Sequence, residues 1–190
     1  MDLSNVQIET DRLRLTPVSE QDLQQIFLEF RLPMTKYMNY TSAGSMEELH
    51  ERYKNWQKEL KQGITLFMVA TLKESGEFLG CFALEEMNQE NPEMGGWLKK
   101  SAHGHGYGRE AAAALKQWAE ENLEYGHIVW PCAKENIASC KLAESLGGKI
   151  HREYEKKMAS GNIWLAREYW ISKNNIGLGG ERDLISSISK

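Results

Sequence analysis

The spacing of apolar residues along the chain predicts alternating strands and helices. Apolar and polar residues alternate over residues 13–18, which predicts a strand. Over 23–30 and again over 49–60 the apolar residues recur every three or four positions, the spacing of one buried helical face. Ser45 followed by Glu48 is a capping box that marks the start of the second helix. The chain therefore opens with one strand and two amphipathic helices.

After Gly63 the pattern changes from a helical period to an extended one. Residues 64–72 and 78–84 are rich in strand-forming side chains, and the turn-forming sequence between them predicts a hairpin. The remaining elements are expected in the order strand, helix, strand, helix and two strands. Their ranges are 93–98, 109–123, 127–133, 136–146 and two segments between 150 and 171, with a turn at 160–162. This order predicts an α/β domain.

Composition narrows the class of protein without identifying it. A chain of 190 residues, 41% of them hydrophobic, is large enough for one compact core. The formal net charge of −4 argues against a general nucleic-acid binder, which would carry a basic surface. No basic start precedes an apolar run, and no apolar stretch approaches the roughly 18 residues that span a membrane. We therefore expect a cytoplasmic protein with neither nucleic acid nor a membrane as a partner.

The cysteines and histidines suggest neither a disulfide framework nor a metal site. Cys81, Cys132 and Cys140 are an odd number without framework spacing, which predicts reduced thiols. No pair of cysteine or histidine residues has the spacing of zinc ligands, so no metal is expected.

The stretch 103–114, HGHGYGREAAAA, places three glycines directly before a run of helix-forming alanines. Gly104, Gly106 and Gly108 remove side chains that would block a ligand, and a helix that follows directs free N–H groups toward an anion. The alternative is a surface turn that only caps the helix. A Walker loop is excluded because no lysine followed by Ser or Thr closes the stretch. A Rossmann fingerprint fits poorly, because its spacing and its place near the first strand are both missing.

Three motifs in order along the chain resemble the GNAT superfamily of acyl-CoA N-acyltransferases, and within it the RimJ/RimL-like branch. The motifs are His103-x-x-Gly106-x-Gly108, Asn136-x-x-Ser139-x-x-Leu142 with Gly147, and the opening segment 9–15, ETDRLRL. The resemblance covers residues 8–172, where we expect a single N-acetyltransferase domain. Periodicity ends after Ser172, and residues 173–190 are expected to form a flexible tail.

The resemblance implies a mixed, mostly antiparallel sheet that is splayed between two strands and flanked by helices. It implies acetyl-CoA as the acetyl donor, with the pyrophosphate on the loop 103–110 and the pantetheine arm on Asn136 and the strand at 97–98. The cofactor-binding residues that it implies are Trp97, Leu98, His103, Gly104, His105, Gly106, Tyr107, Gly108, Arg109, Glu110, Asn136, Ser139 and Leu142. His103 stands where the family has Gln or Arg. Gly96 stands where the branch has Tyr, which should widen the acceptor side.

Amine acetylation needs a group that removes a proton from the amine and a group that stabilises the departing thiolate. For the first role we favour Glu85 over Glu86, although both could be solvated charges at a strand end. The resemblance implies Ser139 for the second role, because Ala143 occupies the place where many superfamily members have a Tyr. Ser139 could instead be only a packing or cofactor contact.

The acceptor is left open between a protein N-terminus and a small amine such as a polyamine. Acidic residues at 47, 48, 85 and 86 would suit a cationic acceptor if they converge. The resemblance makes Trp164 a candidate wall of the acceptor groove, whereas Lys156 and Lys157 are expected on a solvated face. A non-catalytic domain that binds CoA is the alternative from another class. The branch contains dimers, so a homodimer is also left open.

Overall fold

The computed structural model describes residues 1–31, 34–38, 40–157 and 163–173. The strands are β1 (Ile8–Glu9), β2 (Leu13–Pro17), β3 (Leu66–Leu72), β4 (Phe78–Glu85), β5 (Glu93–Leu98), β6 (His127–Ala133), β7 (Lys149–Lys157) and β8 (Ile163–Ser172). The helices are α1 (Leu23–Glu29), α2 (Met46–Gln62), α3 (Tyr107–Asn122) and α4 (Ile137–Ser145), with short 3-10 helices η1 (Glu20–Asp22), η2 (Met34–Tyr37) and η3 (Lys100–Ala102). Every predicted helix and strand of the domain is present in the predicted order.

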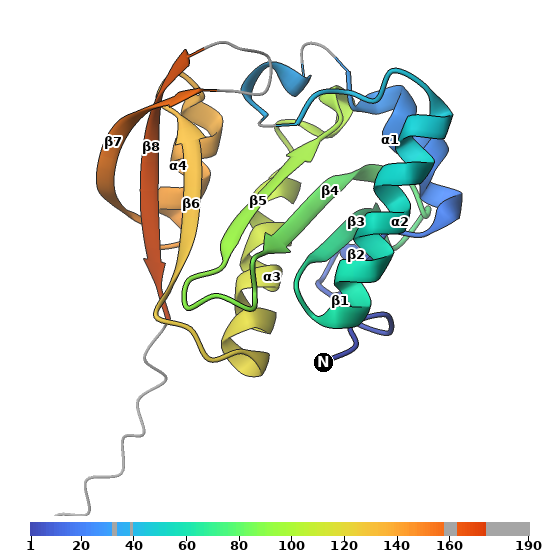
Figure 1. Ribbon diagram of the computed structural model, residues 1–190, viewed down its shortest axis with the longest axis horizontal. Coiled ribbons are helices and arrows are strands. Elements are labelled where there is room, and N and C mark those ends of the chain that lie inside the picture. Colours follow the sequence, from blue (N-terminus) through green and yellow to red (C-terminus); the bar gives the residue numbers. More distant parts are fainter. Residues whose placement is uncertain (32–33, 39, 158–162, 174–190) are drawn as a thin grey trace, which may run out of the picture.

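The eight strands form one sheet in the order β1-β2-β3-β4-β5-β6-β8-β7 (Figure 1). All neighbouring strands run antiparallel except β5 and β6, which are parallel and share a single register pair, Glu93 with Val129. Beyond Glu93 these two strands diverge, whereas β4–β5 and β6–β8 remain paired along their lengths. The fold is therefore the mixed, mostly antiparallel sheet that was expected, and it opens in its middle.

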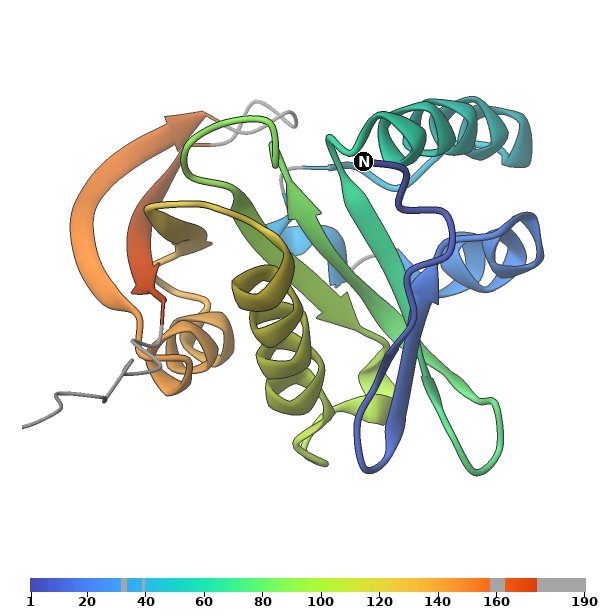
Figure 2. The same ribbon diagram turned by 90° about the horizontal axis from the view of Figure 1, so that it is seen from below.

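Helices cover both faces of the sheet, which explains the sequence pattern of its central strands. In Figure 2, α1 and α2 lie on one face of the N-terminal half and α3 lies on the other. β4 is buried on both sides over residues 78–84, as expected of a strand with two covered faces. The buried side chains of α3 are three alanines, one leucine and Lys116, whose ammonium pairs with Glu120 on the same helix. Small side chains bring the backbone of α3 close to the sheet.

The boundaries of the elements differ from the sequence prediction at a few points. Helix α3 begins at Tyr107, two residues earlier than expected, because Gly106 and not Gly108 is its N-cap. One of the two hydrogen bonds of the predicted capping box of α2 is present, because the Ser45 hydroxyl accepts a hydrogen bond from the Glu48 N–H at 3.2 Å. The expected turn at 160–162 lies outside the described residues.

The tail expected from residue 173 lies outside the described residues except for Lys173. Its ammonium donates to the carbonyl of Leu123 at 2.8 Å. Within the described ranges, none of the helices has both the length and the apolar character needed to cross a lipid bilayer.

Candidate active site

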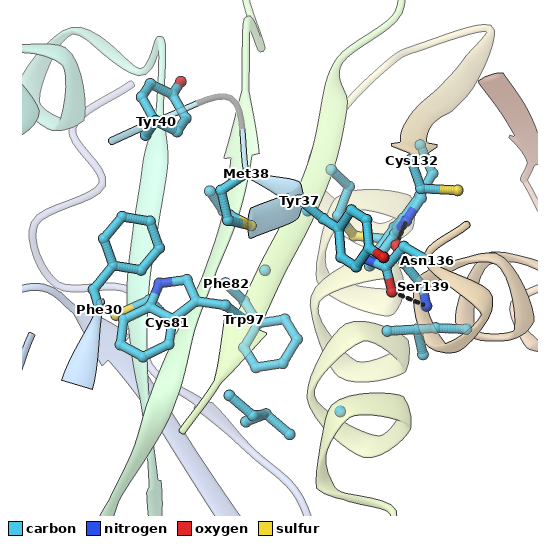
Figure 3. Close-up of a pocket in the computed structure, with 18 of the residues that line it drawn as sticks. Phe30, Tyr37, Met38, Tyr40, Cys81, Phe82, Trp97, Cys132, Asn136 and Ser139 are labelled. Atoms are coloured by element: carbon cyan, nitrogen blue, oxygen red, sulfur yellow. Dashed lines mark hydrogen bonds between the residues drawn. The ribbon is translucent and has the colours of Figure 1, made fainter. Parts of the chain in front are cut away.

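A single cavity of about 1070 Å³ joins the glycine loop to the interior of the splay between β5 and β6. Its walls come from α1, η2 and α2 on one side and from the start of α3, from β6 and from α4 on the other. Figure 3 shows Phe30 and Tyr40 on the side of the cavity opposite Asn136 and Ser139. The predicted cofactor residues that line it are Trp97, Leu98, His103, Gly104, Gly106, Tyr107, Gly108, Arg109, Asn136, Ser139 and Leu142.

The loop before α3 has the backbone geometry of an anion site. Gly104 and Gly106 adopt φ values of +83° and +80°, which strongly favour glycine. Gly106 is the N-cap of α3, and no side chain caps the N–H groups of the first turn. Free N–H groups at the positive end of a 16-residue helix are suited to a phosphate oxygen. The glycines therefore give the loop a backbone geometry that is suited to binding an anion.

Three predicted cofactor residues use their side chains to hold the loop itself. The Nε2 atom of His103 lies 2.9 Å from the carbonyl oxygen of Leu98, which ties the loop to the end of β5. The ring of His105 stacks on Tyr107 with 5.5 Å between centroids. The carboxylate of Glu110 accepts hydrogen bonds from Thr10 and Arg12 at the start of β2. Neither His105 nor Glu110 lines the cavity.

Asn136 and Ser139 form a connected pair at the start of α4. Asn136 is the N-cap of the helix, and its Oδ1 atom accepts from the Ser139 N–H at 3.3 Å (Figure 3). The Ser139 hydroxyl oxygen accepts a hydrogen bond of 3.0 Å from Trp130 Nε1. That bond fixes the Ser139 oxygen at the cavity wall, where the hydroxyl keeps one proton of its own to donate and also has the Cys132 thiol as a hydrogen-bond neighbour.

Cys132 also lines the cavity, beside this pair. Its sulfur lies 3.3 Å from that of Cys140, and both are free thiols. Burial and the neighbouring Cys140 raise the pKa of Cys132 to about 12, so it is a neutral thiol at physiological pH. It therefore forms an uncharged part of the wall.

Two carboxylates face each other across β4 and β5 where the splay begins. Glu85 and Glu93 are register partners in the antiparallel pair, and both line the cavity together with Glu59 of α2. The hydroxyl of Tyr40 donates to Glu85 Oε1 at 2.8 Å. Glu93 was not singled out from the sequence. The available signal was the predicted strand 93–98 directly after the strand 78–84, but the sequence does not give the register that places Glu93 beside Glu85.

The surroundings of these carboxylates shift their pKa values upward. Burial raises the pKa of Glu93 to about 7, helped by Glu85 and opposed by the ammonium of Lys156. Burial also raises the pKa of Glu85, against the opposing effect of the Tyr40 hydrogen bond. A carboxylate with a pKa near 7 can both accept and release a proton at neutral pH.

The other predicted acidic residues do not converge on the cavity. Glu48 pairs with Arg52 and accepts from the Gly44 N–H at 2.8 Å, so it serves the start of α2. Glu86, with φ of 55°, lies in the connection that leaves β4 and lines a separate shallow surface depression. Lys156 was expected on a solvated face, but it lines the cavity. Lys157 is exposed, as expected.

Gly96 does not widen the acceptor side as expected. A Cβ atom at this position would lie 2.4 Å from the ring of Phe82 and 2.8 Å from the carbonyl oxygen of Cys81. Phe82 and Gly96 are register partners on β4 and β5, so the phenyl ring occupies the space that a side chain at 96 would need. The absence of a side chain at 96 is compensated by a larger neighbour.

Trp164 takes the position predicted for an acceptor wall. It lines the cavity from β8 and contacts the ring of Tyr37 in η2 edge-on, with 5.9 Å between centroids. The two aromatic rings therefore join the α1–α2 connection to the C-terminal half of the sheet. Among the described side chains there is no group of three or more His, Cys, Asp or Glu that could hold a metal ion.

A splayed mixed sheet with a glycine loop at one helix start defines an acyl-CoA-dependent transferase in outline, and the comparisons agree. Residues 12–149 match the family model described as "Acetyltransferase (GNAT) domain". The chain therefore belongs to the GNAT acetyltransferase family, as its motifs predicted, and is an acetyl-CoA-dependent acetyltransferase.

The relatives include proteins of the expected branch. The YkkB protein of Bacillus subtilis strain 168 is 28% identical over 158 residues, which cover 79% of this chain and 91% of YkkB. The structure titled RimL, ribosomal L7/L12 alpha-N-protein acetyltransferase in complex with coenzyme A, has a TM-score of 0.79 at 16% identity, covering 88% of this chain and 98% of RimL. Spermidine N-acetyltransferase from Vibrio cholerae, in complex with CoA and spermine, has a TM-score of 0.76 at 18% identity. The match covers 86% of this chain and 97% of that enzyme. These structural likenesses support the fold.

The contact between Gly96 and Phe82 predicts an unequal response of two adjacent glycines. Gly96→Ala should lower the free energy of unfolding by about 1–3 kcal/mol, because the new methyl group overpacks the site. Gly95→Ala is the matched control, since a Cβ there meets no atom within 4 Å. Urea denaturation of both variants checks this. Phe82→Leu should relieve the loss in the Gly96→Ala background, and equal stabilities of the two single variants would contradict the contact.

Proposed function

We propose that the protein transfers the acetyl group of acetyl-CoA to a primary amine by direct attack in a ternary complex. The observation that carries this proposal is the continuity of one cavity from the glycine loop, through the splay, to the carboxylates Glu85 and Glu93. In the proposed complex the pyrophosphate lies on the N–H groups that follow Gly104. The pantetheine arm follows the edge of β5 past Asn136, and the thioester lies near Ser139.

Glu93 is the proposed base. The sequence alone had favoured Glu85. An amine acceptor arrives largely protonated, because its pKa is about 8 for an N-terminus and about 10 for a lysine-like amine. The carboxylate of Glu93 accepts that proton directly or through a water molecule. Its pKa of about 7 lies closer to that of the amine than the pKa of an exposed glutamate does, which lowers the cost of the transfer. Glu85 is already engaged by Tyr40.

The neutral amine then forms a bond to the carbonyl carbon and the carbon–sulfur bond breaks. The nitrogen loses its remaining extra proton as the amide forms, and the thiolate takes up one proton to leave as the free thiol of CoA. The carbonyl oxygen gains negative charge, and an N–H group on the edge of β5 that β6 leaves unpaired stabilises it. The departing thiolate accepts a hydrogen bond from the Ser139 hydroxyl, which Trp130 orients. Ala143 is buried and has no polar side chain, so it does not fill this role.

The acceptor that the cavity favours is a cation. Glu59, Glu85 and Glu93 lie together on its wall, and Lys156 only partly offsets their charge. Amine acceptors also appear in the names of the two similar structures, a ribosomal protein for RimL and spermidine for the Vibrio enzyme. Their low sequence identity does not choose between a peptide N-terminus and a small amine. A panel containing both kinds of acceptor makes that choice.

The first test is calorimetric titration with acetyl-CoA of the wild-type protein and two glycine variants. Gly104 and Gly76 both have φ near +70° to +85° and open space at Cβ, so tryptophan strains each backbone similarly. Only Gly104 lines the cavity, and Gly104→Trp should raise the acetyl-CoA Kd by about tenfold or more by covering the N–H groups. Gly76→Trp should leave it unchanged. A folded wild-type protein that binds no acetyl-CoA would disprove the proposed function.

Binding without acetylation of any amine in the panel would instead support the non-catalytic alternative. That outcome would leave the cofactor site intact and remove the proposed chemistry.

The raised pKa of Glu93 predicts a loss of activity in acid. At saturating substrates the turnover number should fall as pH drops below about 7, because protonated Glu93 cannot accept the proton of the amine. Glu93→Gln should lower kcat by about 10²–10⁴-fold and remove this limb of the pH profile. Glu85→Gln is the control, and it should retain the limb. If Glu85→Gln removes the limb and Glu93→Gln keeps it, the original assignment to Glu85 holds.

The orientation of the Ser139 hydroxyl predicts an effect on turnover and not on cofactor affinity. Ser139→Ala should lower kcat by about 10- to 100-fold, since one donor to the developing thiolate is lost. The acetyl-CoA Kd should change less than about twofold. Ser145→Ala is a matched control on the same helix, where the hydroxyl is bonded to the Leu142 carbonyl at 2.7 Å. Equal kcat values for the two variants would reduce Ser139 to a packing residue.

A further inference from the structure

The segment that leads into β2 grips the loop before α3 through one arginine. The Arg12 Nε atom donates to Glu110 Oε2 at 2.7 Å, and the Arg12 N–H donates to Glu110 Oε1 at 3.0 Å. The Arg12 Nη1 atom donates to the carbonyl oxygen of His105 at 3.0 Å. The guanidinium lies 4.6 Å from the centre of the Tyr107 ring, and Thr10 adds a hydroxyl donor to Glu110. We call Arg12, Glu110 and their contacts to His105 and Tyr107 the Arg12 clamp.

The bond to His105 fixes the direction of an N–H group in the cradle. In a trans peptide the C=O of residue 105 and the N–H of residue 106 lie in one plane and point in opposite directions. Since the His105 carbonyl points to Arg12, the Gly106 N–H points away from Arg12. Gly106 lines the cavity, so this N–H group is available to the ligand. Without the clamp, a loop with glycines at 104 and 106 would have many other conformations to lose on binding.

The clamp also neutralises a charge that would repel the cofactor. Glu110 lies in the first turn of α3, at the same helix end as the proposed pyrophosphate. Although partial burial acts in the opposite direction, hydrogen bonds from Thr10 and Arg12 lower the pKa of Glu110, so it is ionised at neutral pH. Arg12 supplies the compensating positive charge. Its loss would leave a carboxylate beside an anionic ligand.

We infer that Arg12 is a positioning residue of the acetyl-CoA site, although the cofactor need not touch it. It sets the peptide between His105 and Gly106 and cancels the charge of Glu110. This inference rests on the proposed function, because it concerns the affinity of the glycine loop for acetyl-CoA.

Arg12→Met tests the inference against a closely matched control. Arg14 lies two residues further along, in β2, and pairs with Glu9 at 3.1 Å, and the side chains of both arginines are 48% exposed. Arg12→Met should weaken acetyl-CoA binding in calorimetry by about tenfold or more, whereas Arg14→Met should change the Kd by less than about twofold. The thermal midpoints of the two variants should stay within a few degrees of each other. Equal Kd values for the two variants would overturn the inference.

A second substitution separates the charge from a loss of packing. Adding Glu110→Gln to Arg12→Met removes the uncompensated carboxylate, so the double variant should recover at least about threefold of the lost affinity. A general loss of structure would make the double variant worse than the single one, and that result would overturn the electrostatic role. A wild-type protein that binds no acetyl-CoA would refute the proposed function itself, an outcome distinct from both.

Discussion

The single register pair between β5 and β6 is the constraint on which the site depends. Glu93 meets Val129, and beyond this point the two strands separate while the ladders on either side stay paired. The facing strand edges are left with backbone N–H and C=O groups that need partners. A pantetheine arm carries amide groups that can supply them. The sheet therefore makes a binding slot by leaving out hydrogen bonds, without any insertion in the chain.

The same pair fixes the position of the proposed base. Glu93 is the last paired residue before the strands diverge, so its carboxylate lies at the closed end of the slot. This place is partly shielded from water, which is the main reason that the pKa of Glu93 rises. The glycine loop lies beyond the other end of β5. One strand of six residues thus separates the proposed base from the proposed phosphate cradle.

The sequence predicted the architecture well because both faces of the sheet are covered and the helices are amphipathic. It also located the glycine loop and Asn136, whose roles depend on local backbone geometry. It did not single out Glu93, the proposed base, because the sequence does not show which residues of β4 and β5 pair across the seven residues between them. It misjudged Gly96 because the compensating ring belongs to Phe82 on the next strand. The Arg12 clamp joins residues 98 positions apart, so only the folded chain reveals it.

Charge is arranged oppositely at the two ends of the cavity, with one informative exception. At the loop, Arg12 and the start of α3 favour an anion, and at the carboxylates a cation is favoured. Lys156 is the exception, because it places a positive charge at the end of the cavity that favours a cation. Its ammonium lowers the pKa of both Glu85 and Glu93, against the effect of burial. Without it Glu93 would hold its proton more firmly at neutral pH. Lys156 therefore weakens the attraction for a cationic amine but keeps the base available to it.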